Sequence, residues 1–162
     1  MKSDPFRAWI VLTARRGAWA PSLVFFIHLV ALLGFDAYEH FPPLDLPMHF
    51  FGGAAIAYFF HHATLASAAS GLTRGTDAVT HWILILALTS TTTVFWEFAE
   101  FLSDHFFGSH AQLSLADTMG DMLTGFLGGL SLLLARLVFR ARQPRAVPAA
   151  KSLEQSWETP AP

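Results

Sequence analysis

The chain has 162 residues, enough for one domain, and combines 53% hydrophobic residues with only 14% charged residues. Its mean hydropathy of +0.43 is too high for an ordinary soluble domain of this size and favours a polytopic membrane protein. A net charge of −2 leaves no basic surface for nucleic acid, and the lack of cysteine excludes disulfides and thiolate metal sites.

The first element expected is a short helix over residues 5–16, where aromatic and aliphatic residues alternate with arginines. This pattern is typical of a helix lying on the cytoplasmic surface of a membrane. Four segments then approach the roughly 20 apolar residues that span a bilayer. They are predicted at residues 17–35, 44–66, 79–102 and 116–139. We therefore expect one all-α membrane domain, a four-transmembrane-helix bundle over residues 1–140, followed by a disordered cytoplasmic tail over residues 141–162.

The basic residues predict how this bundle is oriented. All ten lysines and arginines fall on one side of the four-span arrangement, and the connections 36–43 and 103–115 contain none. The positive-inside rule then places both termini in the cytoplasm. A cleaved signal peptide is the alternative interpretation of residues 1–37. A long apolar run without a small-x-small cleavage site favours a retained span instead.

Seven ionisable residues lie at the ends of the second, third and fourth segments that we expect to face outward. Their spacings of three, four and seven residues put each group on one face of its helix. Because the three segment ends share one membrane depth, we expect the groups to converge inside the bundle. Small residues on the same faces, including the pair Gly125 and Gly129, favour close helix packing. The seven residues are Asp45, His49, Glu97, Glu100, Asp104, Asp117 and Asp121.

Such a cluster requires compensation for its negative charge. Six carboxylates would face one another with no lysine or arginine on that side. Either several of them are protonated or a cation binds, because carboxylates are expensive in membrane segments. Oxygen ligands together with one imidazole suit Mn²⁺, Fe²⁺ or Zn²⁺, and Mg²⁺ or Ca²⁺ is the alternative. All seven residues are candidate metal ligands, and Glu100 and Asp104 are also candidate catalytic bases.

Helix capping is the structural alternative for part of this cluster. Asp45 and Asp117 could each cap the helix that follows, and Asp104 could lie in a wet loop. Glu97 and Asp121 lie a turn inside their segments, where capping does not apply, so these two argue most strongly for function. The remaining histidines are weaker candidates. We expect solvated loop positions for His105 and His110, packing for His28, and a cytoplasmic-side location for His61, His62 and His81.

Three sequence blocks carry a resemblance to a known family. They are Asp45-Leu-Pro-Met-His49-Phe-Phe-Gly52, Trp96-Glu97-Phe-Ala-Glu100-Phe and Asp117-Thr-Met-Gly-Asp121-Met. In this order they resemble the YjdF-type bacterial inner-membrane proteins and, more distantly, the VanZ-like membrane proteins. The resemblance covers roughly residues 35–135. It implies a multi-pass protein of the bacterial inner membrane and supports the importance of the seven residues, but it implies no reaction.

Two functions of different classes fit these observations. The first is a metal-dependent enzyme at the outer face, acting on a membrane lipid or a lipid-linked or envelope small molecule, with the metal activating water. The second is a cation or proton transport protein that uses the same carboxylates. A non-catalytic envelope or resistance protein is a further alternative. The fading of the polar stripes toward the cytoplasmic half favours a pocket over a transport path.

Overall fold

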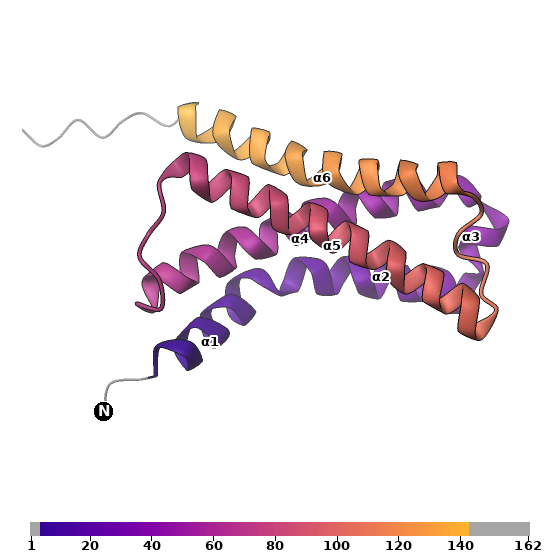
Figure 1. The fold of residues 1–162 in the computed structure, drawn as a ribbon, viewed down its shortest axis with the longest axis horizontal. Helices are drawn as coiled ribbons and strands as arrows, with labels where there is room; N and C mark the ends of the chain where they lie inside the picture. Colours follow the sequence, from indigo (N-terminus) through magenta and orange to yellow (C-terminus); the bar gives the residue numbers. More distant parts are fainter. Residues whose placement is uncertain (1–3, 143–162) are drawn as a thin grey trace, which may run out of the picture.

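The structure of the protein is a computed structural model that describes residues 4–142. Within this range the chain is entirely helical apart from its connections, and it contains no strand. The elements in order are α1 (Pro5–Gly17), α2 (Trp19–Phe35), α3 (Ala37–His40), the 3₁₀ helix η1 (Pro42–Leu44), α4 (Asp45–Ala69), α5 (Ala78–Phe107) and α6 (Leu115–Arg142). Figure 1 shows α2, α4, α5 and α6 running lengthwise, with α3 and the α5–α6 connection at one end.

The helices begin and end close to the boundaries expected from sequence. A short helix α1 does precede α2, and the two meet at a bend of 56°. Helix α5 starts where Asp77 accepts hydrogen bonds from the N–H groups of Val79 and Thr80, both at 3.0 Å. This is the usual way in which an aspartate caps a helix. Helix α6 continues to Arg142, so the predicted tail begins two residues inside it, and residues 143–162 lie outside the described residues.

Two helices, α5 and α6, are long and apolar enough to cross a membrane, and the bent pair α1–α2 makes a third candidate. Their outer faces carry exposed large apolar side chains, such as Phe26 and Phe95. Helix α4 is not among these candidates, since it contains an aspartate and three histidines. The helices agree with a helical membrane protein, whereas the fourth span and the location of the termini stay predictions.

Helix α4 lies at the centre of the bundle and contacts α1, α2, α5 and α6. Its approach to α6 is so close that glycines are required. A Cβ atom added to Gly53 would lie 1.8 Å from the carbonyl oxygen of Gly125, and one added to Gly128 would lie 1.9 Å from that of Phe50. The prediction that small residues bring the helices together is thus confirmed at Gly53 and Gly125. Gly52, by contrast, has no neighbour within 4 Å of such an atom.

An apolar layer fills the middle of the bundle. Ala57 of α4, Ile85 of α5 and Leu133 of α6 are buried there, and partly buried side chains such as Trp82 pack against them. Along each helix these residues fall between two polar regions. One region holds the acidic residues that the sequence singled out, and the other holds histidines and an arginine. The layer therefore separates the two polar ends of the bundle.

Candidate metal centre

His49 stands at the middle of the acidic region, on the first turns of α4. Its Nε2 atom lies 3.5 Å from Oδ1 of Asp45, and its Nδ1 atom lies 3.7 Å from Oε1 of Glu97 on α5. No side chain caps the start of α4, and Asp45 is its first helical residue. The capping alternative for Asp45 is thus not what the structure shows. The carboxylate of Asp45 lies beside His49, where the positive end of the helix dipole also favours it.

Glu97 and Asp121 are the two carboxylates that burial makes most costly. Only 3% of Glu97 and 2% of Asp121 is exposed. Oε1 of Glu97 and Oδ1 of Asp121 have no hydrogen-bond partner among the described residues. The other oxygen of Glu97, Oε2, accepts a bond of 3.3 Å from the side-chain amide of Gln112, which also donates to the Glu97 carbonyl at 3.0 Å. A buried carboxylate oxygen without a donor is destabilising unless a cation or proton compensates it.

The acidic side chains form two overlapping groups that share His49. One consists of Asp45, His49 and Asp121, and the other of His49, Glu97 and Glu100. Within each group one ligand atom from every residue lies within 4.8 Å of the others. Since the two ring nitrogens of His49 face Asp45 and Glu97 respectively, one nitrogen can bind an ion while the other donates to a carboxylate.

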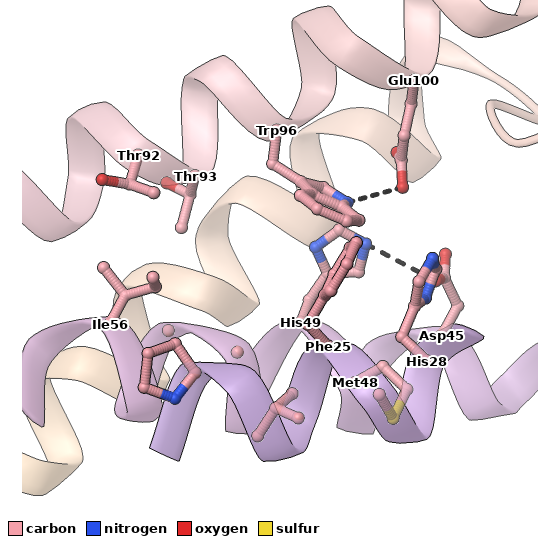
Figure 2. A pocket seen from close by; sticks show the side chains of 14 residues that line it. Phe25, His28, Asp45, Met48, His49, Ile56, Thr92, Thr93, Trp96 and Glu100 are labelled. Atoms are coloured by element: carbon pink, nitrogen blue, oxygen red, sulfur yellow. Dashed lines mark hydrogen bonds and ion pairs between the residues drawn. The ribbon is translucent and has the colours of Figure 1, made fainter. Parts of the chain in front are cut away.

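Glu100 is held by its neighbours at the edge of this cluster. The indole Nε1–H of Trp96 donates to Oε1 of Glu100 at 2.7 Å, and Figure 2 shows both residues on the helix opposite His49 and Asp45. A hydrogen bond to a carboxylate is stronger than one between neutral groups. It fixes one oxygen of Glu100 and leaves the other available. Trp96 was not among the predicted site residues, although its i,i+4 spacing from Glu100 could have indicated it.

Two further residues complete the polar rim. His28 of α2, expected only to pack, lines the cavity beside His49, and its Nδ1 atom lies 2.7 Å from the hydroxyl of Tyr38. Burial raises the pKa of Tyr38 to about 12, and the nearby charges of Asp45 and Glu100 act in the same direction. The phenol therefore stays protonated, and its hydroxyl can donate to Nδ1 of His28 or accept from it, according to the tautomer of the imidazole.

Asp104 and Asp117 lie outside both groups. The carboxylate of Asp104 accepts hydrogen bonds from the N–H groups of Ala111 and Gln112, both at 2.9 Å. Asp117 accepts from the N–H of Leu113 at 3.2 Å, in the first turn of α6. Both side chains thus organise the α5–α6 connection, but neither does so as the alternatives had it. Asp104 lies within α5 and not in a loop, and at the start of α6 it is Ser114 whose side chain accepts a bond of 3.1 Å from the Asp117 N–H. Asp104 and Asp117 contribute to the cluster only indirectly, because the connection that they hold positions the side-chain amide of Gln112 to donate to Glu97.

The charge of the cluster has no counterpart in the surrounding protein. Among the described side chains, those of residues 4–139, no lysine or arginine lies within ion-pair distance of its carboxylates, and within the cluster His49 alone could carry a positive charge. Two like charges 4 Å apart repel by about 4 kcal/mol at an effective dielectric constant of 20. Four carboxylates around one imidazole therefore favour a bound cation or shared protons.

A cavity of about 290 Å³ opens beside the cluster, between α2, α4 and α5. Asp45, His49 and Glu100 form its polar wall, as Figure 2 shows. Most of the remaining wall is apolar, with Phe25 and Met48 among the lining residues. The arrangement can accommodate a small molecule that has an apolar part and a polar group directed at the cluster.

Comparisons with known proteins identify the family. The family described as "Predicted membrane protein (DUF2238)" matches residues 10–142. The chain belongs to this family. The YjdF-type resemblance is thereby confirmed, and the VanZ-like likeness stays a prediction.

The DUF2238 chain is also similar to an uncharacterised protein of Thermotoga maritima. The two are 30% identical over 122 residues, which are 74% of this chain and 60% of the relative. The chain thus spans about 60% of the length of this relative. No solved structure matches it. Membership confirms a membrane protein, and neither comparison names an activity.

Proposed function

We propose that this DUF2238 protein binds one divalent cation at the cluster formed by Asp45, His49, Glu97, Glu100 and Asp121. The observation that carries the proposal is the pair of buried carboxylate oxygens without a donor, one in each ligand group. An ion bound beside His49 would neutralise part of the negative charge of the carboxylates and would contact the two oxygens that lack a donor. Because the set combines oxygens with one imidazole, Mn²⁺, Fe²⁺ or Zn²⁺ is favoured over Mg²⁺ or Ca²⁺.

Metal analysis of the purified protein in detergent tests this proposal. We expect about one transition-metal ion per chain, and Asp121→Asn to weaken binding by about tenfold or more, in line with loss of a charged ligand. Asp77→Asn is the matched control, since it makes the same change at the far end of α5, where asparagine can also cap the helix, and it should alter affinity by less than about twofold. If the folded wild type neither retains nor takes up Mn²⁺, Fe²⁺ or Zn²⁺, the proposal is refuted.

We further propose that the bound ion supports hydrolysis of a lipid or lipid-linked envelope molecule. The cavity favours this function, because its apolar walls suit an alkyl chain while Asp45, His49 and Glu100 of the cluster form its polar wall. In this step the ion, held by Asp45, His49, Glu97 and Asp121, would activate water, and the oxygen of Glu100 that Trp96 does not hold would take the proton. The buried layer of Ala57, Ile85 and Leu133 behind the cluster supports a closed site over a transport path.

The enzyme proposal is tested with a bacterial lipid extract in mixed micelles. Mass spectrometry should detect products with metal-loaded wild type but not with Glu100→Gln that has bound its metal. Wild type that binds metal and leaves every lipid unchanged would contradict hydrolysis of these lipids. Ion flux in proteoliposomes, lost in Glu97→Gln, would favour transport instead.

We also propose a four-span topology in a bacterial inner membrane with both termini in the cytoplasm. Helix α4 supports the fourth span, since 25 residues extend about 37 Å and its histidines face neighbouring helices. The lack of cysteine makes a direct test simple. An impermeant maleimide should label Ser109→Cys in intact spheroplasts and label Thr73→Cys only after lysis. The reverse pattern would refute the orientation.

A further inference from the structure

A second polar cluster lies at the end of the bundle opposite the metal centre. It joins three helices through His61 of α4, His81 of α5 and Arg136 of α6. Nη1 of Arg136 lies 2.7 Å from Nε2 of His61, and Nδ1 of His61 lies 3.0 Å from Nε2 of His81. His61 is 12 residues beyond His49 on the same helix, which is about 18 Å. The two clusters are therefore separate sites.

The hydrogen bonds define the protonation of both histidines. Arginine can only donate, so Nε2 of His61 must accept and carries no proton. The proton of His61 then lies on Nδ1 and is donated to Nε2 of His81, whose own proton lies on Nδ1, 3.4 Å from the hydroxyl of Thr64. Both imidazoles are neutral, and the only positive charge of the cluster is on Arg136. The ring nitrogens are already in use, and the adjacent guanidinium would repel a metal ion.

The charge of Arg136 lacks an anionic partner. Within the described part of the chain no carboxylate lies within 4.0 Å of it, and its guanidinium lies 5.5 Å from the centre of the Tyr58 ring. One of its five N–H groups contacts His61, which leaves the others available. The carboxylate at the start of α5, that of Asp77, accepts from the N–H groups of Val79 and Thr80. An anion would thus complete the site.

An open cavity of about 610 Å³ gives a ligand access to this cluster. Arg136, His61, His81 and Trp82 line it together with apolar residues that include Phe139. The ring of Trp82 stacks on His61 at 5.6 Å. Its indole N–H has no acceptor in residues 4–142, whereas those of the other described tryptophans do, namely Trp9, Trp19 and Trp96. The cavity is therefore lined by a guanidinium and an indole that each have N–H groups without a protein acceptor, beside an apolar surface.

We propose that this cavity binds a phosphate group through Arg136 and Trp82, and that the group belongs to an anionic phospholipid. A guanidinium and an indole N–H are suitable donors to phosphate oxygens. The apolar rim favours a phosphate that carries acyl chains over the free ion, because exposed side chains such as Leu65 and Phe139 would contact those chains. The site requires neither the metal centre nor its proposed reaction.

Native mass spectrometry of the full chain in detergent tests the proposal, with dioleoylphosphatidylglycerol and dioleoylglycerol as matched probes. Wild type should bind the phospholipid and not the neutral lipid. Arg136→Gln should weaken this binding by about tenfold or more, and Trp82→Phe, which keeps the stacking, by about threefold. Arg74→Gln is the control, because it removes an equal charge from the neighbouring connection and should change binding by less than about twofold.

Thermal unfolding verifies that each variant is folded. If Arg136→Gln fails to fold, Trp82→Phe still decides the question. Equal losses in Arg136→Gln and Arg74→Gln would overturn the site, as would equal binding of the two probes. Displacement of the phospholipid by millimolar inorganic phosphate would assign the cavity to a free ion and overturn the lipid. Binding of Zn²⁺ that depends on His61 and His81 would also overturn the proposal.

Discussion

The close contact between the backbones of α4 and α6 can be tested by adding one methyl group to α4. In Gly53→Ala the new Cβ would lie 1.8 Å from the carbonyl oxygen of Gly125. A carbon atom and a carbonyl oxygen in close contact are normally at least about 3.3 Å apart, so the two helices would have to separate by about 1.5 Å. No side-chain rotation can relieve the clash, because the opposing atoms belong to the backbone of α6.

The expected cost follows from overpacking. Extra methylenes in a packed interior usually cost about 1–3 kcal/mol, and a clash with backbone belongs at the upper end of that range. For a chain of this size about 3 kcal/mol corresponds to a fall in Tm of about 6–12 °C. Gly52→Ala places the same methyl group one residue earlier, where nothing lies within 4 Å. It should keep or slightly raise the Tm, since alanine favours the helix by about 0.5–1 kcal/mol.

Circular dichroism of the two purified variants in one detergent measures this difference. Metal affinity provides a second readout, because His49 lies one turn before Gly53 and faces Asp121 across the same contact. Separation of the helices should weaken binding in Gly53→Ala and leave it unchanged in Gly52→Ala. Equal melting temperatures for the two variants would refute the close approach of the helices, whatever the metal does.

Three further predictions concern individual hydrogen bonds. Trp96→Phe removes the donor to Glu100 and should lower metal affinity about threefold to tenfold without a large change in Tm. An unchanged affinity would contradict the role of Trp96 in positioning Glu100. Asp104→Asn should cost about 1 kcal/mol in the free energy of unfolding and weaken metal binding less than Asp121→Asn does, because Asp104 reaches the cluster only through Gln112. A loss as large as that of Asp121→Asn would make Asp104 a ligand. Hydrogen bonds from Thr80 hold the pKa of Asp77 below its usual value. The ionised carboxylate therefore stabilises the fold at any pH above the pKa that Asp77 has in the unfolded chain. This stabilisation is lost as the pH falls through the lower pKa of the folded state. The Tm difference between wild type and Asp77→Ala should therefore shrink on acidification, and a growing difference would contradict this sign.

Helical periodicity allowed much of this structure to be predicted. The expected boundaries of the long helices differ from the observed ones by a few residues, because each is a predominantly apolar run bounded by a short connection rich in polar residues, glycine or proline. Glu97 and Asp121 could be assigned to the cluster because residues well inside a helix cannot serve as caps. Spacing along α4 likewise joined Asp45 to His49, which the structure places 3.5 Å apart.

Contacts made by irregular backbone or by distant residues could not be predicted in this way. Asp104 continues the polar stripe of α5, yet it bonds to the N–H groups of the next connection, whose conformation has no periodic signal. His61 meets Arg136 across 75 positions of sequence. The spacing of residues within one helix cannot show which other helix packs against a given residue such as His61. The number of spans is equally hard to derive, since histidines that face neighbouring helices lower the hydropathy of α4 in the same way as solvent-facing ones.

The tight seam between α4 and α6 also determines which wall of the smaller cavity can yield. Two helices in backbone contact behave as one rigid body, because any sliding would drive carbonyl oxygens into one another. Helix α2 is held much more loosely, with Ala20 its only buried residue, and it bends away from α1 by 56°. An entering molecule would therefore displace α2 rather than α4, which the seam holds to α6. Its route would run sideways from the surrounding bilayer, so that an acyl chain could enter without passing through water.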